Sequence, residues 1–344
     1  MKTIFVVDDS DINLIAEKQA LEGRYRVYTM PSAAKMFQLL EKITPDLILL
    51  DIEMPEMNGF TTLEILQQDS KTAKIPVIFL TATIDENIEA KGFQLGAVDF
   101  ITKPFSKLVL INRIECQLNV SKLIQMRTEH IEKLQNGIVS VLADVVESRD
   151  KATGGHIDRT SKYVRLLLGE MLARGIYREE MQKMQRDWNI DVACASARLH
   201  DIGKIAVSDL ILNKPGKLTP EEFEIVKTHV EQGEQIIDQI IEKTGDVEFL
   251  YFAKLFASCH HERWDGSGYP RGLKGEEIPL QGRVMALADV YDALVSERPY
   301  KQPIPHEMAV QIIRDDAQKQ FDPKLVELFC EIQEQFKIIN TEQQ

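Results

Sequence analysis

Cysteines and long apolar runs are both scarce in this chain of 344 residues. Its four cysteines lie far apart and form no Cys-x-x-Cys pair, which excludes a disulfide framework and is typical of reduced, mostly buried cysteines in a cytoplasmic protein. No apolar run approaches the roughly 20 residues that a membrane span needs. Because the N-terminus reaches Asp8 and Asp9 after a single short apolar run, we also expect no signal peptide.

The chain also lacks a surplus of basic residues. Its 41 Lys and Arg residues stand against 54 Asp and Glu residues, a net charge of −13. Non-specific binding to DNA needs a basic face that displaces counterions, so a DNA-binding role is excluded. A small nucleotide is still compatible with this charge, because a single pocket can be locally positive.

The length is too great for one ordinary domain and predicts two.

The first 120 residues alternate between short apolar runs and helical stretches, which predicts an α/β fold. Continuous apolar strands separated by helices indicate a doubly wound, five-stranded parallel sheet that is covered on both faces. The expected strands are Thr3–Val7, Tyr25–Thr29, Asp46–Leu50, Pro76–Leu80 and Val98–Ile101. The expected helices are Ile12–Leu21, Ala33–Ile43, Thr61–Gln68 and Asn87–Leu95.

Polar residues follow the expected strands at the sheet edge where open α/β sheets bind ligands. They are Asp8, Asp9, Asp51, Thr81 and Lys103. The three clustered carboxylates suit Mg²⁺, and one of them can act as a nucleophile towards a phosphoryl group. The ammonium group would neutralise phosphoryl oxygens, and the hydroxyl would bond to one of them as a switch. The alternative is three unrelated acidic residues that cap helices.

Residues 1–120 resemble the receiver domain of two-component response regulators. The resemblance is carried by DIEMPEMNGF (Asp51–Phe60), TAT (Thr81–Thr83) and KPF (Lys103–Phe105). It implies that a sensor histidine kinase phosphorylates Asp51, that Asp8 and Asp9 hold Mg²⁺, and that the Lys103–Pro104 bond is cis. It also implies that Thr81, Lys103 and Phe100 form the switch.

Residues 106–148 contain no proline and a single glycine, Gly137, which predicts one long helix. Apolar residues recur at steps of seven, which favours a coiled coil between two chains. One seam consists of Ile124, Ile131, Ile138 and Val145, and a second of Val120, Leu134 and Val141. We expect a helical linker over residues 121–143 and a homodimer. The alternative is a helix that packs on its own domain, since Arg127 interrupts the seam.

From residue 144 onward the pattern is helical throughout, and we expect an all-α domain over residues 144–335 followed by a tail over 336–344. The sequence TPEE at Thr219–Glu222 predicts a helix start with a capping box. The expected helices are Thr160–Ala173, Glu180–Leu199, Glu221–Ile241, Gly282–Leu294 and Glu307–Gln318.

Five of the seven histidines fall between residues 156 and 261, and several belong to adjacent pairs. The pairs are His200–Asp201 and His260–His261, and Asp289 adds a second acid. Adjacent helical residues diverge by about 100°, so that a pair can serve two neighbouring metal ions. Imidazoles with carboxylates and no thiolate suit Fe, Mn, Zn, Ni or Co. Two such ions about 3.5–4 Å apart would clamp a phosphodiester and lower the pKa of a water molecule. The alternative is five scattered, unrelated histidines.

Residues from about Val141 to Ile332 resemble the HD-GYP branch of the HD phosphohydrolases. The matching segments are ESRD (Glu147–Asp150), GGH ending at His156, HDIGKI (His200–Ile205), HHERWDGSGYP (His260–Pro270), ADVYDAL (Ala288–Leu294) and RPYK (Arg298–Lys301). The resemblance implies hydrolysis of cyclic di-GMP to linear pGpG and on to GMP. It makes Fe or Mn the expected metals. It implies the metal ligands His156, His200, Asp201, His229, His260, His261 and Asp289.

The resemblance also implies roles around the metal ions. Asp201 would bridge the ions, and Lys204 would stabilise phosphoryl charge. Arg298 and Lys301 would grip substrate phosphates, although both can be ordinary solvated charges. Residues Gly268, Tyr269 and Pro270 would contact substrate, or form only a tight turn or a docking surface for a diguanylate cyclase. Ala152 stands where some members carry a glutamate ligand for a third metal, which predicts a two-metal centre.

Three functions are compatible with these patterns. The first is a phosphorylation-regulated cyclic di-GMP phosphodiesterase. The second is a phosphodiesterase for another cyclic dinucleotide, such as the mixed GMP–AMP ring. The third is a catalytically weak cyclic-dinucleotide sensor or scaffold, against which the complete ligand set and Lys204 argue.

Overall fold

The computed structural model describes residues 1–69, 71–82, 85–149, 155–183, 188–245, 247–297 and 302–341. The chain divides into two compact units, Met1–Glu132 and Lys133–Gln344. In the described ranges no helix combines the length and the apolar character that crossing a bilayer requires.

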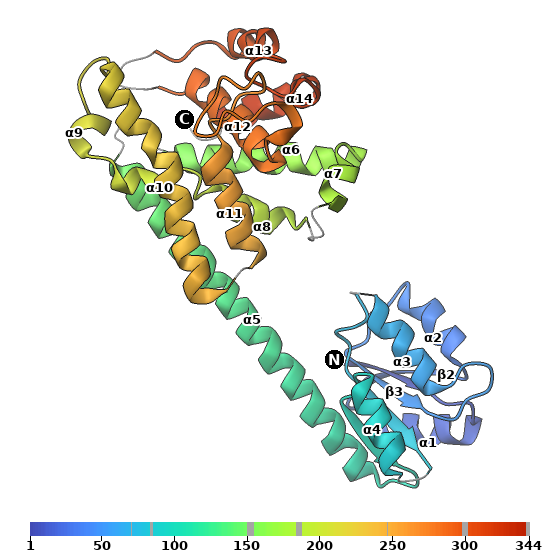
Figure 1. Ribbon diagram of the computed structural model, residues 1–344. Coiled ribbons are helices and arrows are strands. Elements are labelled where there is room, and N and C mark those ends of the chain that lie inside the picture. Colours follow the sequence, from blue (N-terminus) through green and yellow to red (C-terminus); the bar gives the residue numbers. More distant parts are fainter. Residues whose placement is uncertain are drawn as a thin grey trace. The chain divides into compact units, whose positions relative to one another are not determined.

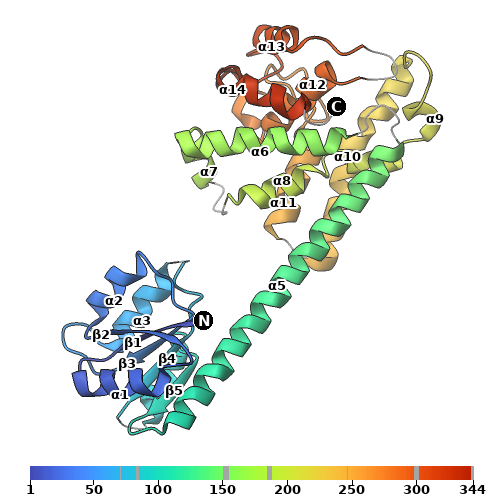
Figure 2. The same cartoon turned by 180° about the vertical axis from the view of Figure 1, so that it is seen from behind.

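The first unit contains a five-stranded parallel sheet in the order β2-β1-β3-β4-β5 (Figures 1 and 2), which confirms the predicted α/β class. Every strand lies within one residue of its expected position, because continuous apolar runs bounded by polar residues leave little choice of ends. The strands are β1 Thr3–Val7, β2 Arg26–Met30, β3 Leu47–Asp51, β4 Val77–Thr81 and β5 Asp99–Thr102. The helices are α1 Asp11–Leu21, α2 Ala33–Leu40, α3 Gly59–Gln68 and α4 Glu86–Gln94.

Alternate residues of each strand supply the two apolar layers of this unit. Phe5, Ile48 and Phe79 point to the face that α2 and α3 cover. Ile4 and Leu49 point to the other face, which α1 and the beginning of the next helix, α5, cover. The sheet is therefore buried on both sides, and its carboxyl edge is left for polar side chains.

Helix α5 runs from Lys107 to Arg149, as the absence of proline and the single glycine predicted. Its first turns belong to the core of the first unit through Leu110, Ile111 and Ile114. Its last turns lie in the second unit, where Val139 and Val146 are buried. The seam residues between these ends are exposed: Val120, Ile124, Ile131, Leu134, Ile138, Val141 and Val145.

The second unit is helical, as predicted (Figure 2), and its buried apolar side chains form two clusters. The capping box at Thr219 is present, and Pro220 is the first residue of its helix. The α-helices after α5 are α6 His156–Arg174, α7 Arg178–Lys183, α8 Ile190–Ala197, α9 Asp209–Leu212, α10 Pro220–Thr244, α11 Glu248–Cys259, α12 Leu280–Val295, α13 His306–Asp315 and α14 Pro323–Thr341, and the 3-10 helices are η1 Ile202–Ala206 and η2 Gly275–Glu277.

Two expectations for this unit differ from the structure. The single helix expected over Glu180–Leu199 is replaced by α7 and α8, and Asn189 caps the start of α8 by accepting from the backbone N–H of Asp191. The last helix extends past residue 335, where a tail was expected. Phe336 is fully buried there, and its ring stacks on Tyr163 with centroids 4.8 Å apart. The apolar period of α14 therefore continues beyond the expected domain end.

A buried carboxyl group in the first unit was not expected from sequence. Glu17 lies in α1 and is 1% exposed, and neither of its carboxyl oxygens has a hydrogen-bond partner in the described part of the chain. Burial, and then the charge of Asp8, raise the pKa of Glu17 to about 8. At neutral pH the side chain is therefore predominantly protonated in the folded protein.

We predict that Glu17→Leu stabilises the protein in a pH-dependent way. The folded state holds a proton that the unfolded chain releases above about pH 4.5, so the unfolding free energy of the native protein falls between pH 4.5 and about pH 8 and levels off above. The Glu17→Leu variant has no carboxyl group at this position, so its unfolding free energy does not fall in this way. We expect the unfolding free energy of the variant, relative to that of the native protein, to rise by about 2–4 kcal/mol from pH 5 to pH 8. Urea unfolding followed by circular dichroism at both pH values measures the difference.

The control is Glu64→Leu, the same substitution at an exposed position of α3. Its effect on the unfolding free energy should be the same at both pH values. If Glu17→Leu also changes the unfolding free energy by the same amount at both pH values, the conclusion that Glu17 is buried and protonated is contradicted.

Candidate metal centre and phosphoacceptor site

The acidic residues at the ends of β1 and β3 meet at the carboxyl edge of the sheet. One ligand atom each of Asp8, Asp9 and Asp51 lies within 4.8 Å of the others. Lys103 donates hydrogen bonds from Nζ to both Asp8 and Asp51, the latter at 2.8 Å. The structure thus brings together four of the five side chains that were predicted to meet here.

Burial and the contacts between Lys103 and the carboxylates shift the pKa values of the side chains at this edge. Burial raises the pKa of Asp51, although the hydrogen bond and charge of Lys103 oppose the shift. Burial would lower the pKa of Lys103, but its bonds to Asp51 and Asp8 outweigh that effect and raise it. A cluster of carboxylates that carries one ammonium group fits a divalent cation, because the cation would offset the remaining negative charge.

Two of the residues predicted to form the switch, Thr81 and Phe100, lie in β4 and β5. Thr81 ends β4 and is buried. The ring of Phe100 is also buried, 5.4 Å from Phe79 and 5.0 Å from Phe93 between centroids. The Lys103–Pro104 peptide bond is cis, as the resemblance implied.

Two groups of possible metal ligands lie in the second unit. In the first, ligand atoms of His229, His260 and His261 lie within 4.8 Å of one another, and in the second those of His156, His200 and Asp289 do so. We call them the three-histidine cluster and the mixed cluster. Their residues come from the start of α6, the turn after α8, the middle of α10, the end of α11 and the second half of α12.

Asp201 lies between the two clusters. Its Oδ1 is 3.3 Å from Nε2 of His229 and 3.7 Å from Nε2 of His260. Its Oδ2 is 3.4 Å from Nε2 of His200 and 2.8 Å from Nζ of Lys204. One carboxylate oxygen therefore faces each cluster, the arrangement that a ligand shared by two ions requires.

The tautomers of three histidines test whether this set fits metal ions. His200 and His229 donate from Nδ1 to the carbonyl oxygens of Ala197 and Val226, at 2.9 and 2.6 Å. His260 donates from Nδ1 to the carbonyl oxygens of Phe256 and Ala257, each at 3.0 Å. With the proton on Nδ1, the neutral form of each ring presents a lone pair at Nε2. Nε2 of His229 and Nε2 of His260 lie only 3.3 Å apart, so a cation between them would relieve the repulsion of these lone pairs.

Charge in the centre follows the same logic. Burial would raise the pKa of Asp201, but Lys204 and His200 hold it well below its usual range. Burial lowers the pKa of His229 to about 4, and burial and the neighbouring His260 lower that of His261 well below its usual range. An ionised carboxylate and neutral imidazoles are the forms that bind metals, so these three groups lose no proton when an ion binds near neutral pH.

His200 and Asp201 were considered as adjacent residues of an α-helix, but they do not lie on one. His200 and Asp201 form a turn between α8 and η1, and Lys204 lies on η1. Gly203 explains the close approach of this turn to α10, because a Cβ atom there would lie 1.8 Å from the carbonyl oxygen of His229. Only glycine allows Asp201 and His229 to come together in this way.

The loop with Gly268, Tyr269 and Pro270 lies against the three-histidine cluster. The Tyr269 ring stacks on His261 with centroids 4.8 Å apart, and its backbone N–H donates to the His261 carbonyl oxygen at 3.2 Å. Buried Glu262 fixes the chain after the loop by accepting from the backbone N–H groups of Arg271 and Leu273 at 2.8 and 3.0 Å. Three further residues considered from sequence, Arg298, Lys301 and Ala152, lie outside the described residues.

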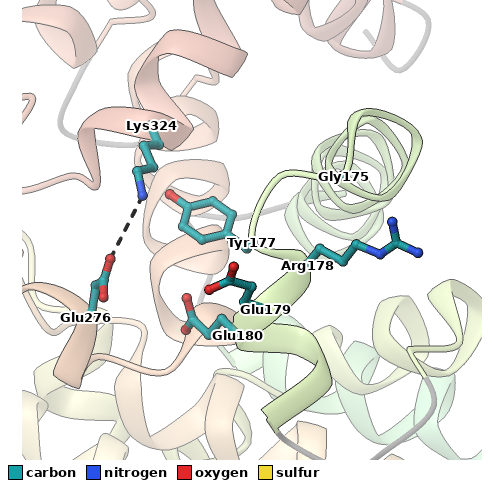
Figure 3. A pocket seen from close by; sticks show the side chains of 7 residues that line it. All are labelled: Gly175, Tyr177, Arg178, Glu179, Glu180, Glu276 and Lys324. Atoms are coloured by element: carbon teal, nitrogen blue, oxygen red, sulfur yellow. Dashed lines mark ion pairs between the residues drawn. The ribbon is translucent and has the colours of Figure 1, made fainter.

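Two cavities bear on where a ligand can bind. One, of about 170 Å³, lies beside the three-histidine cluster, and its walls include Tyr269, Pro270 and Lys227. A larger one, of about 650 Å³, has Tyr177 on its wall and an ion pair between Lys324 and Glu276 at 4.0 Å (Figure 3). No candidate metal ligand is among the described residues that line either cavity, but the smaller one is lined by Tyr269, whose ring stacks on the candidate ligand His261.

Asp292 contacts the mixed cluster through His156, Arg159 contacts Asp292, and both were missed as site residues. Asp292 is buried and accepts from Nδ1 of His156 at 2.8 Å, and from Nε and Nη2 of Arg159 at 2.6 and 3.0 Å. Burial would raise the pKa of Asp292, but these bonds lower it. The spacing in the sequence could have indicated both residues. Asp292 lies three residues after Asp289, and Arg159 three residues after His156, so each shares a helical face with a candidate ligand.

We predict that Asp292→Asn weakens metal binding at the mixed cluster by about 10- to 100-fold, because the partner that orients a ligand histidine loses its charge. Calorimetric titration of the metal-free protein with Mn²⁺ measures the affinity. An Asp9→Asn background, which removes one receiver carboxylate, limits binding at the first unit. Asp191→Asn, in an exposed pair with Arg165, is the control and should bind Mn²⁺ normally. Unchanged affinity in Asp292→Asn would contradict the role.

Comparisons with known proteins identify two domains in this chain. Residues 4–115 match the response regulator receiver domain, and residues 121–325 match the HD domain. A probable cyclic di-GMP phosphodiesterase of Vibrio cholerae is 39% identical over 97% of this chain and 78% of its own length. A cyclic di-GMP phosphodiesterase of Thermotoga maritima is 33% identical over 97% of this chain and 91% of its own length.

A third relative has a different named substrate. It is a 3′3′-cGAMP-specific phosphodiesterase of Vibrio cholerae, 37% identical over 63% of this chain and 38% of its own length. Its match is confined to a smaller share of both chains. Taken with the sheet of the first unit and the helical second unit, the matches show that this chain belongs to the family of response regulators that join an N-terminal receiver domain to a C-terminal HD domain.

Proposed function

We propose that this protein is a phosphorylation-regulated phosphodiesterase that hydrolyses cyclic di-GMP at a two-metal centre, to linear pGpG and on to GMP. The observation that carries the proposal is the position of Asp201, with one carboxylate oxygen facing each cluster of three ligands. Two cyclic di-GMP phosphodiesterases that align with nearly the whole chain support the substrate.

The ligand set favours Fe or Mn as the resident metals, with Ni, Co or Zn as alternatives. His156, His200 and Asp289 would hold one ion, and His229, His260 and His261 the other, with Asp201 shared between them. When bound, the two ions would supply Lewis-acid polarisation of the phosphodiester and a lowered pKa of a water molecule.

The side chains around the centre would bind and orient the substrate. Lys204 lies beside Asp201, so its ammonium group would stabilise the charge that develops on the phosphoryl oxygens. Tyr269 and Pro270 form part of the wall of the 170 Å³ cavity, which would take a portion of the nucleotide next to His261. Gly268 would let the loop pack on the chain next to His261, since a Cβ atom there would lie 2.3 Å from the backbone nitrogen of Arg263. Arg298 and Lys301 would grip the substrate phosphates.

The receiver would control this reaction. Asp51 would accept a phosphoryl group from a sensor histidine kinase, with Mg²⁺ held by Asp8 and Asp9. The bonds of Lys103 to Asp8 and Asp51 support this role, since the ammonium group would neutralise the added phosphoryl charge. Thr81 and Phe100 would then report the modification to the rest of the unit.

The partners expected from sequence remain part of the proposal. The exposed apolar seam of α5 supports a homodimer through this helix, because such residues at steps of seven are the pattern of a coiled coil. Docking to a diguanylate cyclase and a cytoplasmic location stay predictions.

A second candidate substrate is the mixed cyclic GMP–AMP ring. It is favoured by the 37% identity to a 3′3′-cGAMP-specific phosphodiesterase over 63% of the chain. A catalytically weak sensor or scaffold is the third candidate, and the intact ligand clusters argue against it.

We predict that the purified protein, loaded with Mn²⁺ or Fe²⁺ without exposure to air, produces linear dinucleotide from cyclic di-GMP. His200→Ala combined with Asp201→Ala should lower kcat at least about 10³-fold, because the mixed cluster loses a ligand and both ions lose the shared one. Chromatography of the products from cyclic di-GMP and from mixed cyclic GMP–AMP in parallel measures both rates.

His130→Ala is the matched control, since this histidine is exposed on α5 and belongs to neither cluster. Its rate should equal that of the native protein. Turnover that persists in the double variant would contradict the metal centre, and no linear product from either substrate would contradict the enzyme.

A further inference from the structure

The last turn of α5 is hydrogen-bonded to the mixed cluster. Glu147, two residues before the helix ends, accepts from the backbone N–H of His156 at 2.8 Å through Oε1. His156 is the first residue of α6, where backbone N–H groups have no partner inside their own helix. A side chain of α5 thus caps the helix that presents a ligand histidine.

The same turn is bonded to the segment that carries Lys204. Arg149 donates from Nη1 to the carbonyl oxygen of Ile205 at 2.6 Å and from Nη2 to that of Val207 at 3.0 Å. Its Nη1 also lies 3.4 Å from the carbonyl oxygen of Lys204. The planar guanidinium therefore spans the end of η1, and an ion pair to Asp209 at 2.7 Å holds it in place.

The backbone of this turn is fixed as well. The Asn213 side chain donates to the carbonyl oxygen of Arg149 at 2.8 Å. Val139 and Val146, on the same helix, are buried against Leu199 and Ile202, which flank the His200–Asp201 turn. The end of α5 therefore packs against the residues that flank the His200–Asp201 turn. It is hydrogen-bonded to His156 and to the segment that follows Asp201.

We propose that Glu147 and Arg149 are positioning residues that set the spacing of the metal centre and make it sensitive to the placement of the last turn of α5. A shift or rotation of this turn would move the N–H capped by Glu147 on one side and the carbonyl groups held by Arg149 on the other. His156 and Lys204 would then change position relative to Asp201. The regulatory part of this inference rests on the proposed function, since α5 begins in the receiver.

The first experiment measures metal binding and does not depend on activity. Glu147→Ala should raise the Kd for Mn²⁺ at the mixed cluster about tenfold or more, since a partner that positions a ligand is lost. Glu147→Gln should stay within about threefold of the native protein, because its amide oxygen can accept the same N–H. Calorimetric titration in the Asp9→Asn background gives both values.

The second experiment separates positioning from substrate binding. Arg149→Ala should lower kcat about tenfold or more while KM changes less than about threefold, because η1 shifts and the substrate contacts remain. Arg149→Lys should give an intermediate kcat, since one ammonium group cannot span the three carbonyl oxygens. Arg174→Ala, in an exposed cluster with Glu170 and Glu331, is the control and should leave kcat unchanged.

The third experiment tests coupling to the receiver. Activity is measured with and without beryllofluoride, which mimics the phosphoryl group on Asp51, and the ratio of the two rates is compared between variants. The ratio should move towards one in Arg149→Ala and keep its native value in Arg174→Ala.

The outcomes are distinguishable. Native Mn²⁺ affinity in Glu147→Ala together with native kcat in Arg149→Ala would overturn the proposal. If an alanine variant does not fold, the same measurements are made on Glu147→Asp, whose shorter side chain cannot reach the His156 N–H, and on Arg149→Lys. Native values in both of these variants would likewise overturn it. A native protein without turnover would contradict the proposed function alone, and the Mn²⁺ titration would still decide the positioning role.

Discussion

The second unit depends on one interaction, the contact of a single carboxylate with two groups of imidazoles. Asp201 is ionised in a buried site because Lys204 and His200 stabilise its charge, and each of its oxygens faces a different cluster. Hydrogen bonds of the neighbouring histidines and the close packing of the backbone hold this arrangement. The donated Nδ1 protons turn Nε2 of the ligand histidines towards the centre, and Gly203 lets the turn that bears Asp201 approach α10.

In each unit one lysine is bonded to carboxylate groups of the candidate site. In the receiver, Lys103 bonds to two carboxylates at a sheet edge, and in the HD domain Lys204 bonds to the carboxylate that joins the clusters. In both places a single ammonium group offsets part of the charge and leaves ligand atoms directed at a common point. Helix α5 belongs to the core of the first unit at its start and reaches the metal ligands of the second through Glu147.

The sequence predicted most of the fold and the composition of the site for a physical reason. Strands of the sheet are continuous apolar runs, so their ends were placed within one residue, and six of the seven expected metal ligands lie in the motifs that carry the resemblance, with His229 outside them. The orienting residues were not predicted, because Asp292, Glu147 and Arg149 act through contacts between chain-distant elements. The prediction of a single helix over Glu180–Leu199 was wrong because apolar periodicity alone does not indicate the interruption at residues 188–189. Phe336 was assigned to a tail because its partner, Tyr163, is far away in the chain.

The central claim is that Asp201 joins two ligand clusters so that metal ions bind as a pair. Electron paramagnetic resonance of the protein loaded with Mn²⁺, in the Asp9→Asn background, tests it most directly. We predict the spectrum of an exchange-coupled pair of ions in the protein with Asp201, and of separate ions after Asp201→Ala. A six-line spectrum of isolated ions in the protein that retains Asp201 would contradict the claim.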